Sequence, residues 1–388
     1  MKTSRIFMSA LMAALMVAGL SSCNNNGKNP VADPDDYTLG GRLTEDLTLK
    51  QGETYMLESS LQVVAPATLT IEPGVTIIAD ESAGSDNIIY ILIEQGARIM
   101  AEGTASEPIV MTSENKEPGA WGGLHICGKA HTNADGETTS EIGNAPYGGN
   151  EDNDDSGVLK YIRIEYSGLA LDSEHEANGI SLYGVGAGTQ ISYIYVVDGS
   201  DDGIEFFGGS ADIDHCVVEN CTDDSYDWTE GWDGSAEYII AYQSVAECDC
   251  LMECDNNGDN NDATPVANPT IRYATFIGNN STENHRGLRL REGTYVNLSN
   301  ALVCGKPDPI TLDTPQTVAS FDNGKSSISN TVIVGELLNE EGAGYDNAAF
   351  LADGNSSVEE MSFTGKYVGM IGESGAVSAD DNWTAWIK

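Results

Sequence analysis

Two groups of acidic residues, 22 residues apart, are the clearest candidates for chemistry in this chain. Each group holds a pair of aspartates and, three residues after the pair, a further carboxylate. If the two groups lie on neighbouring turns of the chain, like charges stand about 5 Å apart and repel by about 3 kcal/mol per pair at an effective dielectric of 20. Partly buried carboxylates at that distance need protonation or a hard cation, and Ca²⁺ accepts such oxygens. We therefore predict a calcium site formed by Asp201, Asp202, Glu205, Asp223, Asp224 and Asp227.

The same aspartates have a structural alternative, because Asp side chains cap turns by accepting hydrogen bonds from the backbone. A second acidic segment, residues 255–262, alternates oxygen-bearing side chains like a calcium loop but lacks the closing glutamate of an EF-hand. We expect either a solvated turn there or a looser cation site formed by Asp255, Asn257, Asp259 and Asn261.

Basic and aromatic residues are the other candidates for ligand contact. Arg289 and Arg291 share one face if they lie on a strand, where they could bind an acidic sugar or pair with neighbouring acids. Trp232 lies outside the best repeat register and is the predicted surface aromatic. Trp228, by contrast, coincides with Phe206 in the repeat and is expected to face the core.

The elements that must position these residues follow from the same repeat. Residues 191–209 align with residues 213–231, and their apolar positions coincide: Ile191 with Ile213, Ile194 with Cys216, Val196 with Val218, Ile204 with Tyr226 and Phe206 with Trp228. Short β-branched and aromatic runs with Gly and Asp at the corners, in register at a fixed period, are typical of a solenoid of stacked coils. A β-sandwich or jelly roll also has short strands, but it does not predict such columns.

Short strands of the same kind occur on both sides of the repeat and end in small or polar turns: residues 67–79, 90–114, 159–168, 270–279, 296–305 and 327–336. No segment carries a helical period of useful length, so we expect bends rather than crossover helices between the strands. The sequence therefore predicts an all-β fold, a right-handed parallel β-helix, over residues 38–388.

Five blocks, in order, resemble a group of bacterial cell-envelope β-helix lipoproteins, most of which are uncharacterised. The resemblance spans residues 38–305, and it implies a parallel β-helix and a cell-envelope location but transfers no catalytic residue. The blocks are GAWGGLHICGKA (119–130), DDSGVLKYIRIEYSG (154–168), NGISLYGVGAG (178–188), DDGIEFFGG (201–209) and DDSYDW (223–228).

The start of the chain predicts export. An apolar run at residues 6–20 is too short to cross a bilayer, which needs about 20 apolar residues, so residues 1–22 are the predicted signal peptide. The sequence LSSC at its end resembles the lipobox of bacterial lipoproteins, which implies an N-terminal lipid on Cys23. Residues 23–37, rich in Asn, Pro, Gly and Asp, are the expected flexible tether. We expect an outer-membrane lipoprotein on the periplasmic or the cell-surface face.

Composition narrows the class of partner. Removal of the signal peptide takes away two basic residues, so the mature charge is 16 minus 61, or −45. Such a charge argues against nucleic acid and anionic lipid as partners, because phosphate recognition relies on Lys and Arg, and it favours cations. Seven cysteines follow Cys23, and an odd number leaves at least one free thiol if disulfides form.

These features predict a non-enzymatic binding or adhesion module that is anchored to the membrane by lipid, stabilised by Ca²⁺ and directed at a glycan or an envelope protein. Two alternatives stay open. One is a polysaccharide-active enzyme, either a lyase with a basic residue beside Ca²⁺ or a glycoside hydrolase with paired carboxylates. The other is an accessory lipoprotein of an outer-membrane transporter.

Overall fold

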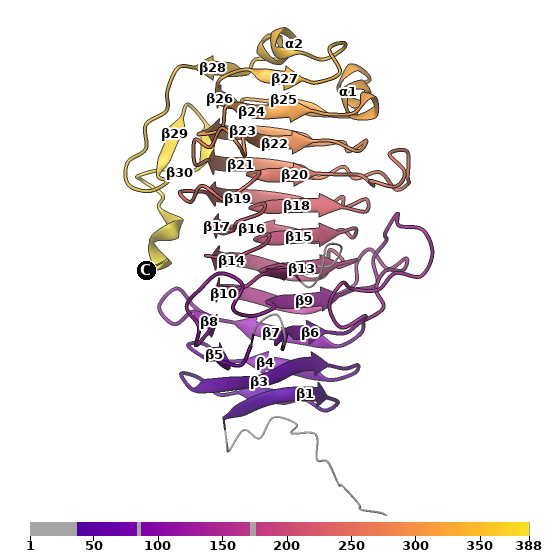
Figure 1. Ribbon diagram of the computed structural model, residues 1–388, viewed down its shortest axis with the longest axis vertical. Helices are drawn as coiled ribbons and strands as arrows, with labels where there is room; N and C mark the ends of the chain where they lie inside the picture. Colours follow the sequence, from indigo (N-terminus) through magenta and orange to yellow (C-terminus); the bar gives the residue numbers. More distant parts are fainter. Residues whose placement is uncertain (1–36, 84–86, 171–175, 388) are drawn as a thin grey trace, which may run out of the picture.

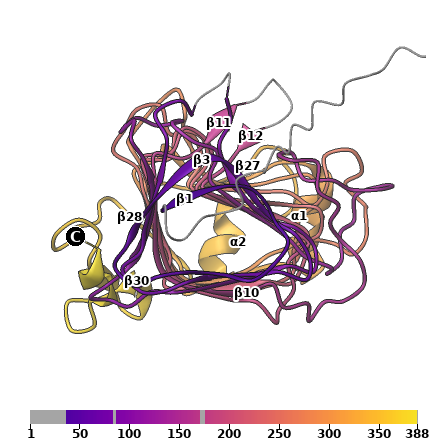
Figure 2. The same cartoon turned by 90° about the horizontal axis from the view of Figure 1, so that it is seen from below.

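Short strands with alternating buried and exposed side chains stack into one long solenoid. The computed structural model describes residues 37–83, 87–170 and 176–387. The chain passes through three columns of parallel strands, in the repeating order A, B, C (Figure 1). Seen along its length, the solenoid has a roughly triangular section around one continuous apolar core (Figure 2). The predicted parallel β-helix is confirmed, and its parallel main sheet excludes the sandwich alternative.

Each column is defined by the strands that pair along it. Column A contains the second halves of β1 (Thr38–Leu43) and β3 (Thr54–Val63), then β6 (Ile91–Ile93), β9 (Leu124–Cys127), β13 (Ile180–Tyr183), β15 (Ile204–Phe207), β18 (Tyr226–Thr229), β20 (Met252–Cys254), β22 (Arg286–Leu290), β24 (Asp308–Leu312) and β27 (Leu337–Asn339).

Columns B and C share several strands that bend at the corner between them. Column B contains β2 (Leu47–Leu49), β4 (Thr68–Ile71), β7 (Arg98–Glu102), β16 (Asp212–Asp214), β25 (Ser327–Ser329) and the first halves of β10 (Gly157–Glu165), β14 (Gln190–Val197), β19 (Ser235–Tyr242), β21 (Thr270–Ile277) and β23 (Asn297–Cys304). Column C contains the second halves of these five strands, the first halves of β1 and β3, and β5 (Thr76–Ala79), β8 (Ile109–Ser113), β17 (Val217–Glu219), β26 (Val332–Val334) and β28 (Ser356–Val358).

The register predicted from the repeat is confirmed where strands pair. Ile191 lies beside Ile213 and Val196 beside Val218, in columns B and C. In column A, β15 lies beside β18 with Ile204 against Tyr226, Phe206 against Trp228 and Glu205 against Asp227. A 22-residue period therefore places both the apolar and the acidic positions of one coil over those of the next.

The expectation that no helix interrupts the strands is wrong at the C-terminal end. Helices α1 (Pro315–Asp322) and α2 (Asn347–Ala352) connect the last coils, and η1 (Trp383–Trp386) lies near the terminus (Figure 1). These helices have eight, six and four residues, too few for an apolar period to stand out in the sequence. Phe350 of α2 is fully buried, and α2 lies across the end of the core in the axial view (Figure 2).

Two segments add to the coils. Residues 128–156 form a long insertion after β9, and it packs a satellite apolar cluster against the outer side of column A. Residues 359–387, here called the strap, turn back along the coils and carry the antiparallel pair β29 (Gly369–Ile371) and β30 (Ser374–Val377) (Figure 1). The other antiparallel pair is β11 (Leu169–Ala170) with β12 (Glu176–Ala177).

The predicted signal peptide, the predicted lipid site at Cys23 and all but the last residue of the expected tether lie outside the described residues. Within residues 37–83, 87–170 and 176–387, no helix combines the length and the apolar character that crossing a membrane requires.

Candidate functional site

Acidic side chains gather where the chain passes from column C into column A. Asp202 and Asp224 lie in the turns that precede β15 and β18, and Glu205 and Asp227 lie on those strands. Because Ile204 and Phe206 of β15 are buried in the core, the strand alternation directs Glu205 outward between them. The neighbouring strand continues the outward column, since Asp227 lies beside Glu253 of β20.

These side chains surround a cavity of about 280 Å³, here called the acid cavity. Its walls bear eight carboxylates and one guanidinium: Glu141, Asp202, Glu205, Asp223, Asp224, Asp227, Asp249, Glu253 and Arg289. Oxygens of Asp202, Glu205 and Asp227 lie within 4.8 Å of one another. The same is true of Asp201, Asp202 and Asp223, and of Asp223, Asp224 and Asp249. The six predicted acids are therefore brought together.

Backbone contacts show that some of these acids also organise turns. Asp202 Oδ1 accepts a hydrogen bond from the Asp224 backbone N–H at 2.8 Å, and Asp224 Oδ1 accepts one from the Cys250 N–H at 2.6 Å. The structural alternative considered from the sequence thus applies to one oxygen of each aspartate. Asp227 differs, because its Oδ1 is shielded from solvent and no donor among the described residues reaches it.

Crowding raises the proton affinity of the cluster. Burial, followed by the nearby Asp224, raises the pKa of Asp202 well above its usual range. Burial and Asp227 raise the pKa of Glu205 in the same direction. For Asp227 itself, burial and then Asp202 raise the pKa, while Arg291 partly opposes the shift. The cluster therefore retains protons that free carboxyls would lose, unless a cation takes their place.

Two arginines end the acidic column. Arg289 contacts Glu253 and Asp313, each at 3.0 Å, and Arg291 contacts Glu253 and, at 2.7 Å, Asp255. Burial lowers the proton affinity of Arg289, but the hydrogen bond to Asp313 outweighs it and the pKa is raised. Arg289 on β22 and Arg291 just after its end both pair with neighbouring acids, and this is the one of their two predicted roles that the geometry supports.

In the second predicted cation loop, side-chain oxygens are already bonded to other groups of the protein. Asp255 is paired with Arg291, which opposes the effect of burial, and its pKa is raised to about 6. Asn257 Oδ1 accepts hydrogen bonds from the backbone N–H groups of Asp259 and Asn260, each at 3.0 Å. The loop is thus organised as a turn rather than as a ring of cation ligands.

The prediction of Trp232 as a surface aromatic is wrong. Its side chain is 0% exposed and stacks on Phe206 with the ring centroids 3.9 Å apart. Its Nε1–H donates to the Ala211 carbonyl at 3.0 Å, so the polar atom is also satisfied inside. The turn after Gly231, which has φ of +85°, brings this ring back into the core beside Trp228.

Sequence reasoning missed a different aromatic feature at the corner between columns B and C. There, a half-exposed ladder of stacked rings has neighbouring centroids 4.3–4.9 Å apart, and it comprises Tyr161, Tyr193, His215, Tyr238 and Tyr273. All five have φ of +49° to +54°, the left-handed bend that turns each coil at this corner. The sequence signal that could have predicted this ladder is a Tyr directly before Ile or Ala in several of the coils.

Three acids of the cavity were also missed. Glu253 and Asp249 belong to the next coil, where Cys250 follows Asp224 by 26 residues instead of 22, so the simple repeat does not reach them. Glu141 comes from the long insertion. The seven cysteines that follow Cys23 are all buried and free, and Cys250 lies within 4.8 Å of oxygens of Asp224 and Glu253.

Comparison with protein families matches residues 41–386 to the family described as pectate-lyase like beta helix domain. No curated protein and no solved structure matches the chain significantly.

Proposed function

The chain belongs to the pectate-lyase-like β-helix domain family, and we propose that it is a non-enzymatic, Ca²⁺-dependent binding module for acidic glycans of the cell envelope. In this proposal Ca²⁺ occupies the acid cavity, and the bound ion presents its remaining coordination positions to a sugar carboxylate. The module is held at the outer membrane by a lipid on Cys23, a part of the proposal that rests on the lipobox-like sequence and the tether.

The observation that carries the proposal is the convergence of Asp202, Glu205 and Asp227. Two ligands of one Ca²⁺ can be at most twice the Ca–O distance apart, which is about 4.6–5.2 Å. The three carboxylate oxygens satisfy that limit, because all lie within 4.8 Å of one another. The Asp227 Oδ1 without a donor is an oxygen that a cation would satisfy.

Electrostatics favour an acidic glycan only when a cation is bound. The chain carries a formal charge of −43, so an anionic polymer is repelled by the bare surface. Bound Ca²⁺ offsets part of the negative charge of the eight carboxylates and can accept a sugar carboxylate as a further ligand. Family membership is compatible with either binding or cleavage of such polymers.

Two features favour binding over cleavage. A lyase base must give up its proton near neutral pH, but ion pairs raise the pKa of Arg289 and Arg291 despite the opposing effect of burial. A glycoside hydrolase spaces its two carboxyl groups by about 5–5.5 Å or about 6.5–9.5 Å. In the acid cavity, by contrast, three carboxylates converge, with one oxygen from each of Asp202, Glu205 and Asp227 within 4.8 Å of the others, and such convergence suits an ion better than a sugar bond.

Calorimetric titration of the EDTA-treated mature protein with Ca²⁺ tests the ion site. We expect binding that is lost in the double variant Glu205→Gln, Asp227→Asn and kept in the control Asp380→Asn, because Asp380 is exposed and does not line the cavity. The same samples are then run by affinity electrophoresis through gels that contain polygalacturonate or alginate.

The expected electrophoretic result is retardation of the protein that requires Ca²⁺ and is absent in the double variant. Polymer recovered from the gel is assayed for new reducing ends and for unsaturated uronate. Accumulation of either product would show an enzyme and refute the non-enzymatic assignment. Absence of Ca²⁺ binding would refute the ion site itself.

A further inference from the structure

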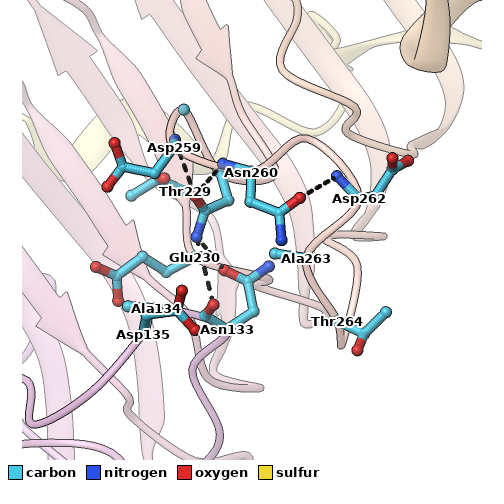
Figure 3. A pocket seen from close by; sticks show the side chains of 12 residues that line it. Asn133, Ala134, Asp135, Thr229, Glu230, Asp259, Asn260, Asp262, Ala263 and Thr264 are labelled. Carbon is cyan, nitrogen blue, oxygen red and sulfur yellow. Dashed lines mark hydrogen bonds between the residues drawn. The ribbon is translucent and has the colours of Figure 1, made fainter.

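A second cavity, separate from the acid cavity, has a volume of about 650 Å³. Three segments that are far apart in the sequence line it, and it is called the loop cavity here (Figure 3). They are residues 133–135 of the long insertion, Thr229 and Glu230 at the end of β18, and residues 257–264 between β20 and β21. Volumes of about 300–1,000 Å³ are usual for small-molecule sites.

A network of asparagine side chains holds the walls of this cavity in place. Asn133 is 7% exposed and donates through Nδ2 to Asn256 Oδ1 at 2.8 Å and to the Pro265 carbonyl at 2.9 Å. Asn257 Nδ2 donates to Asn133 Oδ1 at 3.0 Å. Asn256, fully buried, donates to the Ala263 carbonyl at 3.1 Å. The long insertion and the 257–264 loop are therefore fixed to each other, so a ligand meets a formed site.

Glu230 is anchored from one side. The hydroxyls of Thr132 and Tyr147 both donate to its Oε2, at 2.6 and 2.8 Å. Among the described residues, both hydrogen bonds to this carboxylate go to Oε2 and none goes to Oε1. One carboxylate oxygen thus fixes the side chain while the other remains an acceptor for hydroxyl groups of a ligand.

The remaining wall groups select the chemistry of the ligand. Carboxylates, amides and hydroxyls line the cavity, and no Lys, Arg or aromatic side chain of the described residues does. Anionic ligands are therefore disfavoured, and stacking on a flat ring is not available. Hydroxyl donors suit the excess of acceptors.

The arrangement of the carboxylates distinguishes a polyol from a cation. Glu230 and the aspartates at 135, 259 and 262 are spread over the walls, as Figure 3 shows. None of them belongs to a group of three acidic, cysteine or histidine side chains that converge within 4.8 Å in the described residues. Dispersed acceptors match the dispersed hydroxyls of a sugar chain, whereas a metal ion needs convergent ligands.

We propose that the loop cavity binds a neutral oligosaccharide through its hydroxyl groups, without a metal ion. This site goes beyond the acidic-glycan function proposed above and does not require it. The two cavities lie on the same face of β18, because Asp227 borders one and Thr229 the other, two residues or about 7 Å along the strand. A glycan chain seated in the loop cavity can therefore extend toward the acid cavity.

Saturation-transfer NMR and calorimetry of the mature protein in EDTA test this site with neutral trisaccharides of glucose, galactose, mannose and xylose. We expect at least one to bind with a dissociation constant of about 0.1–10 mM, as is usual when hydrogen bonds act without stacking. Thr229→Trp fills the cavity and should weaken binding at least about tenfold. Thr54→Trp, at an exposed position on β3, is the matched control. Glu230→Gln keeps an acceptor for Thr132 and Tyr147 and should weaken binding by about threefold to tenfold.

Three results would overturn the proposal. One is the absence of binding by every trisaccharide at about 20 mM. A second is unchanged affinity in Thr229→Trp while its thermal unfolding matches that of the control. The third is salt-sensitive binding of a glucosamine trisaccharide, added as a cationic probe, when no neutral trisaccharide binds, which would identify a cation site. Since EDTA is present throughout, a failure here leaves the Ca²⁺ site of the acid cavity untouched, and the reverse also holds.

Discussion

Replacement of Asp227 by Asn should stabilise the metal-free protein and at the same time remove its stabilisation by Ca²⁺. At 4.8 Å, an effective dielectric of 20 gives a repulsion of about 3.5 kcal/mol between two ionised carboxylates. Asp227 makes two such pairs, with Asp202 and Glu205, so full ionisation of all three would cost about 7 kcal/mol of repulsion at that distance. Proton uptake by the crowded cluster removes most of this repulsion, and we expect a net gain of about 2 kcal/mol at pH 8.

The assay is thermal unfolding at pH 8 in EDTA and in about 1 mM Ca²⁺. Unfolding entropies of about 2.1 cal/mol/K per residue correspond to roughly 0.7 kcal/mol/K for this domain, so 2 kcal/mol raises the metal-free Tm by about 3 °C. For the unsubstituted chain, a dissociation constant of about 10 μM gives a Ca²⁺ stabilisation of about 2.7 kcal/mol, or about 4 °C. Asp227→Asn should show the first gain and lose the second.

A matched control separates the cavity from general charge effects. Asp380→Asn makes the same chemical change at an exposed site on the strap and should leave both melting temperatures unchanged within about 1 °C. If Asp227→Asn lowers the Tm in EDTA, the carboxylate is a structural hydrogen-bonding group, and the reasoning from repulsion is wrong. An undiminished Ca²⁺ shift in this variant would place the ion elsewhere.

Three further predictions concern pH, packing and the strap. Carboxyls with raised pKa values, including that of Asp255 at about 6, bind protons more tightly in the folded protein than in the unfolded chain. The Tm of the metal-free protein should therefore rise as the pH falls from 8 to 5. In Ca²⁺ this rise should be smaller, because protons displace the ion. A Tm in EDTA that falls over this range would contradict those shifts. Trp232→Ala should cost about 3–5 kcal/mol in thermal or urea unfolding, since it empties a fully buried site, and a loss below 1 kcal/mol would contradict that packing. Lys366→Met leaves Glu219 without its ion-pair partner and should speed proteolysis and hydrogen exchange of the strap, whereas Lys325→Met, at an exposed position, should not.

The fold could be predicted from the sequence because, in the repeat, residues 22 positions apart point to the same side of successive coils. Once Ile204 coincides with Tyr226 and Phe206 with Trp228, Glu205 must lie beside Asp227 on the outer side, as the structure shows. The acids of the cavity that belong to the 22-residue repeat could be predicted from the sequence. Whether its acids bind Ca²⁺ is a matter of ion affinity that no residue pattern decides.

What lay beyond prediction depends on insertions and turns. The four extra residues before Cys250 shift the period and hide Glu253, while Glu141 enters the cavity from an insertion with no repeat of its own. Trp232 was misplaced because a turn outside the repeat register can point either way, and here it points inward. The loop cavity likewise arises from long-range contacts of Asn133 that have no signature in local sequence.

The strap has a consequence for how this molecule can change in evolution. Solenoids ordinarily gain or lose whole coils by duplication, since each coil touches only its neighbours. Here β30 lies against β19, β21 and β23, while Lys366 reaches Glu219 on β17. A coil inserted between β17 and β23 would pull these attachment points apart by about 4.8 Å, and the strap would lose its fit unless it lengthened as well. The strap thus disfavours any change in the number of coils over this part of the solenoid.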